Sequence, residues 1–192
     1  MPTRGSPFIA NFFYHVYNRG VDKGAIFFSE ENYLYFLRLL KKNLERYAVN
    51  VVAYCLMPNH FHFLLSPVLD DNISRFMKSL LGSYSQALNK QRQRSGPLFQ
   101  GRFQSILVDR GEYIIHLARY IHLNPVKAGL VSSLDEWCYS NYLDVIGLRS
   151  GKLKDASLVP ERFASGDDYR KFVEEYWEET KEPKDFEGYL LD

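Results

Sequence analysis

The stretch that decides the fold of this chain is Met57-Pro58-Asn59-His60-Phe61-His62-Phe63-Leu64-Leu65. A proline followed by an asparagine marks a turn, and the apolar runs on both sides of it are typical of β-strands. We therefore expect a hairpin, with one strand over residues 50–57 and the next over residues 60–66.

The second strand of this hairpin carries two histidines separated by one apolar residue. Successive side chains of a strand point to opposite faces, so His60 and His62 share one face and Phe61 lies on the other. Two neighbouring imidazoles can bind one divalent metal ion together. The ordinary alternative is a pair of structural histidines, one hydrogen-bonded and one exposed.

Hydrophobic periodicity along the rest of the chain predicts helices and strands in alternation. Ser29 and Asp109 are suitable N-caps, and Pro125 disfavours helical geometry at the residue before it, so a helix should end at Asn124. The order β-α-β-β-α-β-α predicts an α+β fold, an antiparallel sheet with helices packed on it. The further strands are expected over residues 11–18 and 98–108, and the helices over about 30–47, 72–93, 109–124 and 168–179.

Composition places the chain among ordinary globular proteins. Apolar residues make up 46% of it, and Cys55 and Cys138 are the only cysteines. We see no signal-peptide pattern and no apolar run near the roughly 20 residues of a membrane helix. We therefore expect a cytoplasmic protein with reduced thiols and no membrane partner.

Charge is unevenly distributed along the sequence. The net charge is +1, but residues 167–192 carry −6 and residues 1–166 carry +7. A basic body with an acidic tail is compatible with a polyanionic partner, and equally with ordinary solvated charge.

A helix later in the sequence offers a third candidate metal ligand and a candidate nucleophile. Tyr113, His116, Tyr120 and Asn124 form a polar stripe on the expected helix, with Tyr120 and Asn124 one turn apart. The carboxamide of Asn124 could complete a metal site with the two histidines, and the Tyr120 hydroxyl would then lie beside the metal. A tyrosine next to a divalent cation can attack phosphorus and form a phosphotyrosine. Oxygen and nitrogen ligands together suit Mg²⁺ or Mn²⁺.

Four stretches of the chain resemble one known family, the single-tyrosine transposases of the HUH superfamily, and most closely its REP-associated members. The resemblance covers roughly residues 8–147. The stretches are Tyr14–Gly20 (YHVYNRG), Met57–Leu65 (MPNHFHFLL), Gly101–Phe103 with Arg119–Leu130 (RYIHLNPVKAGL), and Trp137–Tyr142 (WCYSNY).

This resemblance implies a metal-dependent enzyme that nicks and rejoins single-stranded DNA, often at hairpins. It implies that His60, His62 and Asn124 bind the metal and that Tyr120 becomes linked to the 5′ end of the cut strand. It implies a ferredoxin-like related sheet and allows either a homodimer or a monomer. We expect a catalytic domain over residues 1–147 and an acidic extension over residues 148–192.

Basic residues near aromatic ones are expected to contact the DNA, because cations bind phosphates and rings stack on bases. Arg19 and Lys127 are expected to reach a phosphate near the cut. The others, around residues 96–103, are Lys90, Arg92, Arg94 and Arg102. His15, His116 and His122 are expected to be structural or on the surface.

Three other functions remain compatible with these residues. One is a domesticated relative that binds hairpin DNA as a regulator without cutting it. Another is a replication-initiator or relaxase-like nickase with the same site. The third is a ferredoxin-like RNA-binding module, which would need no metal.

Overall fold

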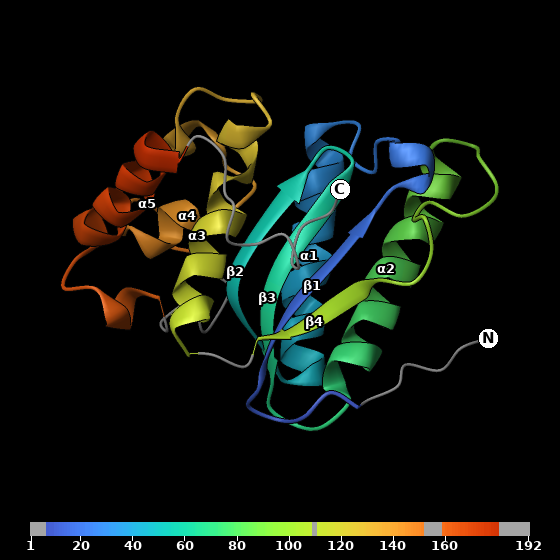
Figure 1. Ribbon diagram of the computed structural model, residues 1–192. Coiled ribbons are helices and arrows are strands. Elements are labelled where there is room, and N and C mark those ends of the chain that lie inside the picture. The colour runs from blue at the N-terminus through green and yellow to red at the C-terminus, as the bar shows by residue number, and fades with distance from the viewer. Residues whose placement is uncertain (1–6, 109–110, 152–158, 181–192) are drawn as a thin grey trace.

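An antiparallel sheet of four strands forms the middle layer of the molecule (Figure 1). The computed structural model describes residues 7–108, 111–151 and 159–180. The strands follow the order β2-β3-β1-β4, in which β1 and β3 are central. Their bounds are Phe13–Arg19 (β1), Val49–Met57 (β2), His60–Pro67 (β3) and Gln104–Val108 (β4). The expected α+β fold and the hairpin are therefore confirmed.

Two helices cover one face of this sheet, α1 (Glu30–Tyr47) and α2 (Asn72–Gln91). The core between them and the sheet is largely aromatic: Phe36, Phe61 and Phe63 are fully buried. Phe61 lies here because it alternates with the two histidines along β3, which leaves those histidines on the other face.

A second group of helices lies on that other face. Helix α3 (Gly111–Lys127) packs over β2 and β3, and α5 (Gly166–Thr180) packs on α3 through the buried residues Tyr169 and Val173. The described helices include none long and apolar enough to cross a membrane. The shorter helices are η1 (Val21–Lys23), η2 (Leu134–Glu136), α4 (Tyr142–Val145) and η4 (Pro160–Arg162).

Two predicted boundaries were wrong by three residues or more. The fourth strand begins at Gln104 rather than at residue 98, because the chain before it departs from β1 in a bulge. Helix α3 continues through Pro125 to Lys127, although a proline lacks the N–H that would bond to the carbonyl of Ile121. The side chain of Asn124 supplies the missing donor, with Nδ2 at 3.4 Å from that carbonyl. The expected N-cap Asp109 lies outside the described residues.

A buried asparagine connects helix α3 to the edge of the sheet. Val52 is an extra residue in β2, where the register with β3 shifts. The Nδ2 of Asn141 donates to the Val52 carbonyl at 3.1 Å, and its Oδ1 accepts from the Tyr54 N–H at 2.7 Å. The same Oδ1 lies 2.9 Å from Nε2 of His122 on α3, whose Nδ1 lies 2.8 Å from the Tyr169 hydroxyl. One carboxamide thus bonds to the backbone groups of the bulge and also positions α3.

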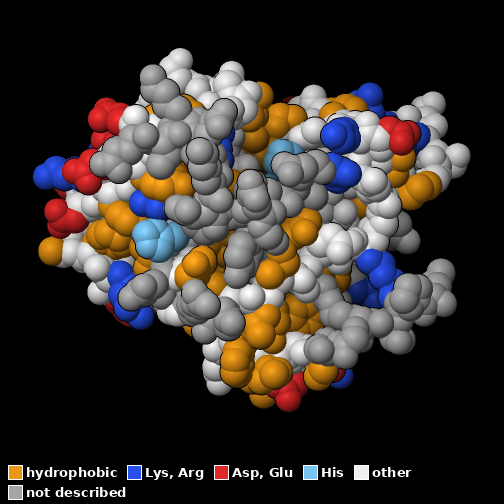
Figure 2. All heavy atoms as spheres, in the orientation of Figure 1, with side chains coloured by type: hydrophobic (Ala, Val, Ile, Leu, Met, Phe, Trp, Pro, Cys, Tyr) orange, Lys and Arg blue, Asp and Glu red, His pale blue; other side chains and the backbone are white. Residues whose placement is uncertain are grey.

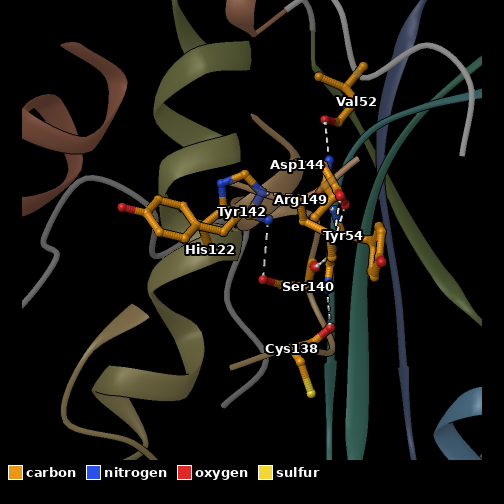
Figure 3. Close-up of polar contacts among 9 residues, drawn as sticks. Val52, Tyr54, His122, Cys138, Ser140, Tyr142, Asp144 and Arg149 are labelled. Carbon is orange, nitrogen blue, oxygen red and sulfur yellow. Dashed lines mark hydrogen bonds and ion pairs between the residues drawn. The ribbon is translucent and has the colours of Figure 1, made fainter. Parts of the chain in front are cut away.

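The segment that carries Asn141 is itself held by an arginine (Figure 3). Arg149 forms an ion pair with Asp144 at 2.7 Å and donates to the carbonyls of Cys138 and Ser140. The chain at Ser140 also pairs with Cys55 of β2. This segment therefore covers the outer edge of β2, where unpaired backbone groups would otherwise be exposed.

The stability of the fold should depend on pH through His122. Burial lowers the pKa of His122 to about 4, whereas in an unfolded chain it is about 6.5. Between these values the unfolded chain binds more protons, so stability is fully present above about pH 6.5 and falls as the pH drops toward 4. Urea unfolding at about pH 7.5 and about pH 5 should differ by about 2 kcal/mol more in the unmodified protein than in His122→Gln. Equal pH dependence in both proteins would contradict this account.

Candidate metal and nucleophile site

The two histidines of β3 lie side by side on the face that α3 partly covers. Their ring centroids are 5.0 Å apart. Burial lowers the pKa of His60 to about 4, with a contribution from the charge of Arg19, and it lowers the pKa of His62 well below its usual value. Both rings are therefore neutral at neutral pH, which is the state that can bind a metal.

The hydrogen bonds of these rings indicate which nitrogen of each would face a ligand. Nδ1 of His60 donates to Oδ1 of Asn59 at 2.6 Å. Nδ1 of His62 lies 2.9 Å from Nε2 of His15, which is fully buried on β1. A ring that donates through Nδ1 keeps the lone pair on Nε2. His60 therefore offers Nε2 to a ligand, and His62 does the same in the tautomer that donates from Nδ1 to His15.

Helix α3 brings the predicted nucleophile to these histidines. The rings of Tyr120 and His62 meet edge to face with centroids 6.0 Å apart, and Tyr120 is buried. Asn124 is buried one turn later and donates through Nδ2 to the Tyr120 carbonyl at 2.8 Å. Because the amide nitrogen is directed back to the helix, the carbonyl oxygen is the atom of Asn124 that is suited to a ligand.

A lysine lies at the end of the same helix, over the tyrosine ring. Nζ of Lys127 is 4.5 Å from the ring centroid of Tyr120, a cation–π geometry. Partial burial lowers the pKa of Lys127 to about 8. Its ammonium therefore stays largely charged at neutral pH and is held against the phenol.

These residues fit a divalent cation in the chemistry of their donors. Two neutral imidazoles with Nε2 available and one carboxamide oxygen form a mixed nitrogen and oxygen ligand set, which suits Mn²⁺ and accommodates Mg²⁺. Among the described residues, no group of three or more His, Cys, Asp and Glu side chains could hold a metal ion. A site here would therefore depend on Asn124 as well as on the histidines.

Apart from Lys127, the predicted DNA-binding residues fall into two groups. Arg19 and Arg102 lie close to the histidines: Arg19 pairs with His60 across the β1–β3 ladder, and both arginines line one cavity. Lys90, Arg92 and Arg94 belong instead to the end of α2 and the loop after it.

The second group lies beside another aromatic ring. The guanidinium of Arg92 stacks 3.9 Å from the ring centroid of Phe28, and Arg94 donates to the carbonyl of Pro97 at 3.0 Å. Figure 2 shows basic side chains gathered beside a histidine at the upper right of the face in view.

One residue near the site was not recognised from the sequence. His15 was expected to be structural or surface-exposed, and it is buried, but it also contacts His62 directly. Its place on a strand was predictable, whereas the pairing of that strand with β3 was not. The predicted polar stripe divides. Tyr120 contacts His62, and Asn124 is buried one turn later. Nδ1 of His116 instead lies 2.9 Å from a guanidinium nitrogen of Arg119, and its ring packs near Phe172 of α5.

Comparison with known proteins identifies relatives of this chain. The sequence model of the family described as "Transposase IS200 like" matches residues 9–124. A Haemophilus influenzae protein named as a REP-associated tyrosine transposase is 28% identical over 148 residues, which is 66% of this chain and 84% of that protein. A solved structure of a REP-associated tyrosine transposase bound to a REP hairpin superposes with a TM-score of 0.65 at 18% identity, covering 81% of this chain and 94% of that one. At this identity the structural match shows the shared fold.

The contact between His15 and His62 predicts an effect on metal binding. Replacing His15→Phe removes the partner of His62 Nδ1 and should weaken Mn²⁺ binding roughly 10- to 100-fold, because such partners orient the ligand ring. Electron paramagnetic resonance of free Mn²⁺ during a titration measures this directly. His116→Phe, a similar change on α3 away from the histidines, should bind Mn²⁺ like the unmodified protein. Equal affinities in the two variants would argue against the role of His15.

Proposed function

The chain belongs to the IS200-like transposase family, and on that premise we propose that it cuts and rejoins single-stranded DNA with Tyr120 as the nucleophile. The observation that carries this proposal is the contact between Tyr120 and His62, with ring centroids 6.0 Å apart. A tyrosine that contacts one of two neighbouring neutral imidazoles and lies below an ammonium group has the surroundings that phosphoryl transfer needs.

The proposed reaction exchanges one ester bond for another. The phenol oxygen of Tyr120 attacks the scissile phosphorus and loses its proton. The bond between phosphorus and the 3′ oxygen breaks, and that oxygen leaves as a 3′-hydroxyl after taking up a proton. The 5′ end of the strand is then linked to Tyr120 as a phosphotyrosine. Attack by a 3′-hydroxyl on this linkage reverses the step and rejoins a strand.

The surrounding side chains favour this reaction electrostatically. His60, His62 and Asn124 would hold Mg²⁺ or Mn²⁺, which when bound would polarise the non-bridging phosphate oxygens and stabilise their charge in the transition state. The ammonium of Lys127 lies over the Tyr120 ring. A positive charge there favours loss of the phenol proton and attracts the phosphate.

The proposed substrate is a single strand that carries a hairpin. The structural relative was solved with a REP hairpin, and the fold of this chain matches it. The basic residues lie at the end of the sheet where the histidines lie: Arg19 and Arg102 beside the site, and Lys90, Arg92 and Arg94 at the end of α2. They provide cations for phosphates on both sides of a cut, and the stacked Arg92 and Phe28 provide a planar surface for a base.

The covalent intermediate gives the first test of this function. Tyr120→Phe should abolish the protein–DNA adduct, because the attacking oxygen is removed, while hairpin binding changes little. Labelled hairpin-bearing single strands are incubated with the protein and Mn²⁺, and the adduct is detected as a band that survives denaturation. Tyr113→Phe, on the same helix, is the matched control and should form the adduct normally.

An undiminished adduct yield in Tyr120→Phe would overturn the assignment of the nucleophile. Hairpin binding by the unmodified protein with no adduct under any divalent cation would favour a DNA-binding regulator instead.

The histidines give the second test. His60→Ala combined with His62→Ala should abolish Mn²⁺-dependent cleavage and leave hairpin binding within a few-fold of normal, since the phosphate contacts come from other residues. Circular dichroism establishes that the variant is folded, and His60→Ala alone serves as the milder change because His60 is less buried than His62. Cleavage by the unmodified protein that persists undiminished in EDTA would contradict the metal role.

A further inference from the structure

A cavity with a volume of about 240 Å³ lies beside the two histidines, where β1 meets β4. The residues that line it include Tyr17, Arg19, Gln100, Arg102 and Gln104. Neither the metal binding nor the nucleophilic attack proposed above uses this cavity, and only its two arginines have been assigned a role, in binding phosphate.

The cavity exists because the β1–β4 ladder is interrupted. Tyr17 pairs with Gln104, and the next pair along is Gly20 with Phe99. The segment opposite β1 therefore carries two extra residues and bulges away from it. Such bulges are common next to active sites, where they redirect side chains.

Hydrogen bonds fix the bulge in this shape. Nδ2 of the buried Asn18 donates to the carbonyl of Gly101 at 3.1 Å, and the N–H of Gln100 donates to the carbonyl of Arg19 at 2.9 Å. Gly20, whose pairing with Phe99 closes the bulge, has no room for a side chain, because a Cβ there would lie 2.0 Å from the carbonyl oxygen of Gly24. The cavity is thus a built feature of the fold.

The walls of the cavity suit a nucleobase better than a phosphate alone. They combine one phenol ring, three carboxamides (Asn18, Gln100 and Gln104) and two guanidinium groups, and the described lining residues include no Asp or Glu. The ring of Tyr17 offers a surface for stacking, and a carboxamide offers a donor and an acceptor to the edge of a base. Nε of Arg19 donates to Oε1 of Gln100 at 2.5 Å, which fixes the direction of the guanidinium.

The cavity is adjacent to the proposed reaction centre. Tyr17 is the register partner of His62, and their ring centroids are 6.1 Å apart. Gln104, Tyr17 and Arg19 lie on the same face of the sheet as the histidines, because alternate residues of paired strands share a face. A strand held with its phosphate at Tyr120 would therefore pass the mouth of the cavity.

We propose that this cavity binds one unstacked nucleobase of the substrate strand next to the scissile phosphate, and that Gln104 reads its hydrogen-bonding edge. The inference rests on the proposed function, since it takes the cut strand as the source of the base. Tyr17 stacks on the base, Arg19 contacts its edge or its phosphate, and the cavity selects which sequence is cut.

Strand selection with inactive protein tests the cavity separately from the reaction. Hairpin-bearing single strands, randomised over about four nucleotides on each side of the cut, are bound to the Tyr120→Phe protein, recovered and sequenced. A base preference is expected at one position. Adding Gln104→Ala should reduce that preference roughly tenfold and leave the other positions unchanged. Gln86→Ala, an exposed glutamine on α2, is the matched control and should leave the whole profile unchanged.

A second variant distinguishes base reading from a general loss of structure. Gln104→Glu removes the donor and keeps the acceptor, so the preference should shift toward a base that carries an amino group. A shifted preference requires a folded protein. The inference would be overturned if the base-preference profile were the same in Tyr120→Phe alone and in its combinations with Gln104→Ala and Gln104→Glu. The absence of any base preference would overturn it as well.

The outcomes for the cavity and for the proposed function are separate. An unaltered base-preference profile together with a normal adduct at Tyr120 would refute base binding in the cavity and leave the proposed cutting and rejoining of DNA standing. An altered profile with no adduct would support the cavity in a protein that binds DNA without cutting it.

Discussion

The geometry of the site depends on one buried carboxamide, that of Asn141. Its amide nitrogen donates to the carbonyl of the bulged residue Val52 of β2. Its oxygen accepts from the Tyr54 N–H and lies 2.9 Å from Nε2 of His122 on α3. His122 lies two residues after Tyr120 on the helix. The carboxamide that bonds to the backbone of the β2 bulge therefore also helps to position α3 over β3. The position of α3 in turn sets the contact between Tyr120 and His62.

The proline in helix α3 also has a role, because it leaves a backbone carbonyl that a side chain must satisfy. Pro125 leaves the carbonyl of Ile121 without its usual backbone donor, and Asn124 turns its amide nitrogen toward that carbonyl. This fixes which end of the carboxamide points away from the helix. A residue that looks like a helix terminator thus orients a candidate ligand, and Lys127 can reach the Tyr120 ring because the helix continues past the proline.

The fold was largely predictable from the sequence, because apolar periodicity and the turn at Pro58 report local structure. The hairpin, both long helices and the shared face of His60 and His62 follow from that periodicity. The contacts of His15 and Asn141 do not, since they join segments 47 and 87 to 89 positions apart whose pairing is decided by packing. The continuation of α3 beyond Asn124 was missed because a side chain, rather than the backbone, compensates for the proline. Tyr120 and Asn124 were singled out because they are one helical turn apart, and their roles stay predictions.

The strand order gives the two proposed tasks different freedom to change over evolution. The histidines come from β3, which is paired on both sides, so a change in its register would disturb the whole sheet. The bulge belongs to the segment leading into β4, which lies at the edge and pairs only with β1 among the described strands. Insertions or substitutions there can reshape the cavity while the reacting groups keep their places. Proteins with this fold can therefore change the DNA sequence that they select while the residues proposed for the reaction stay the same.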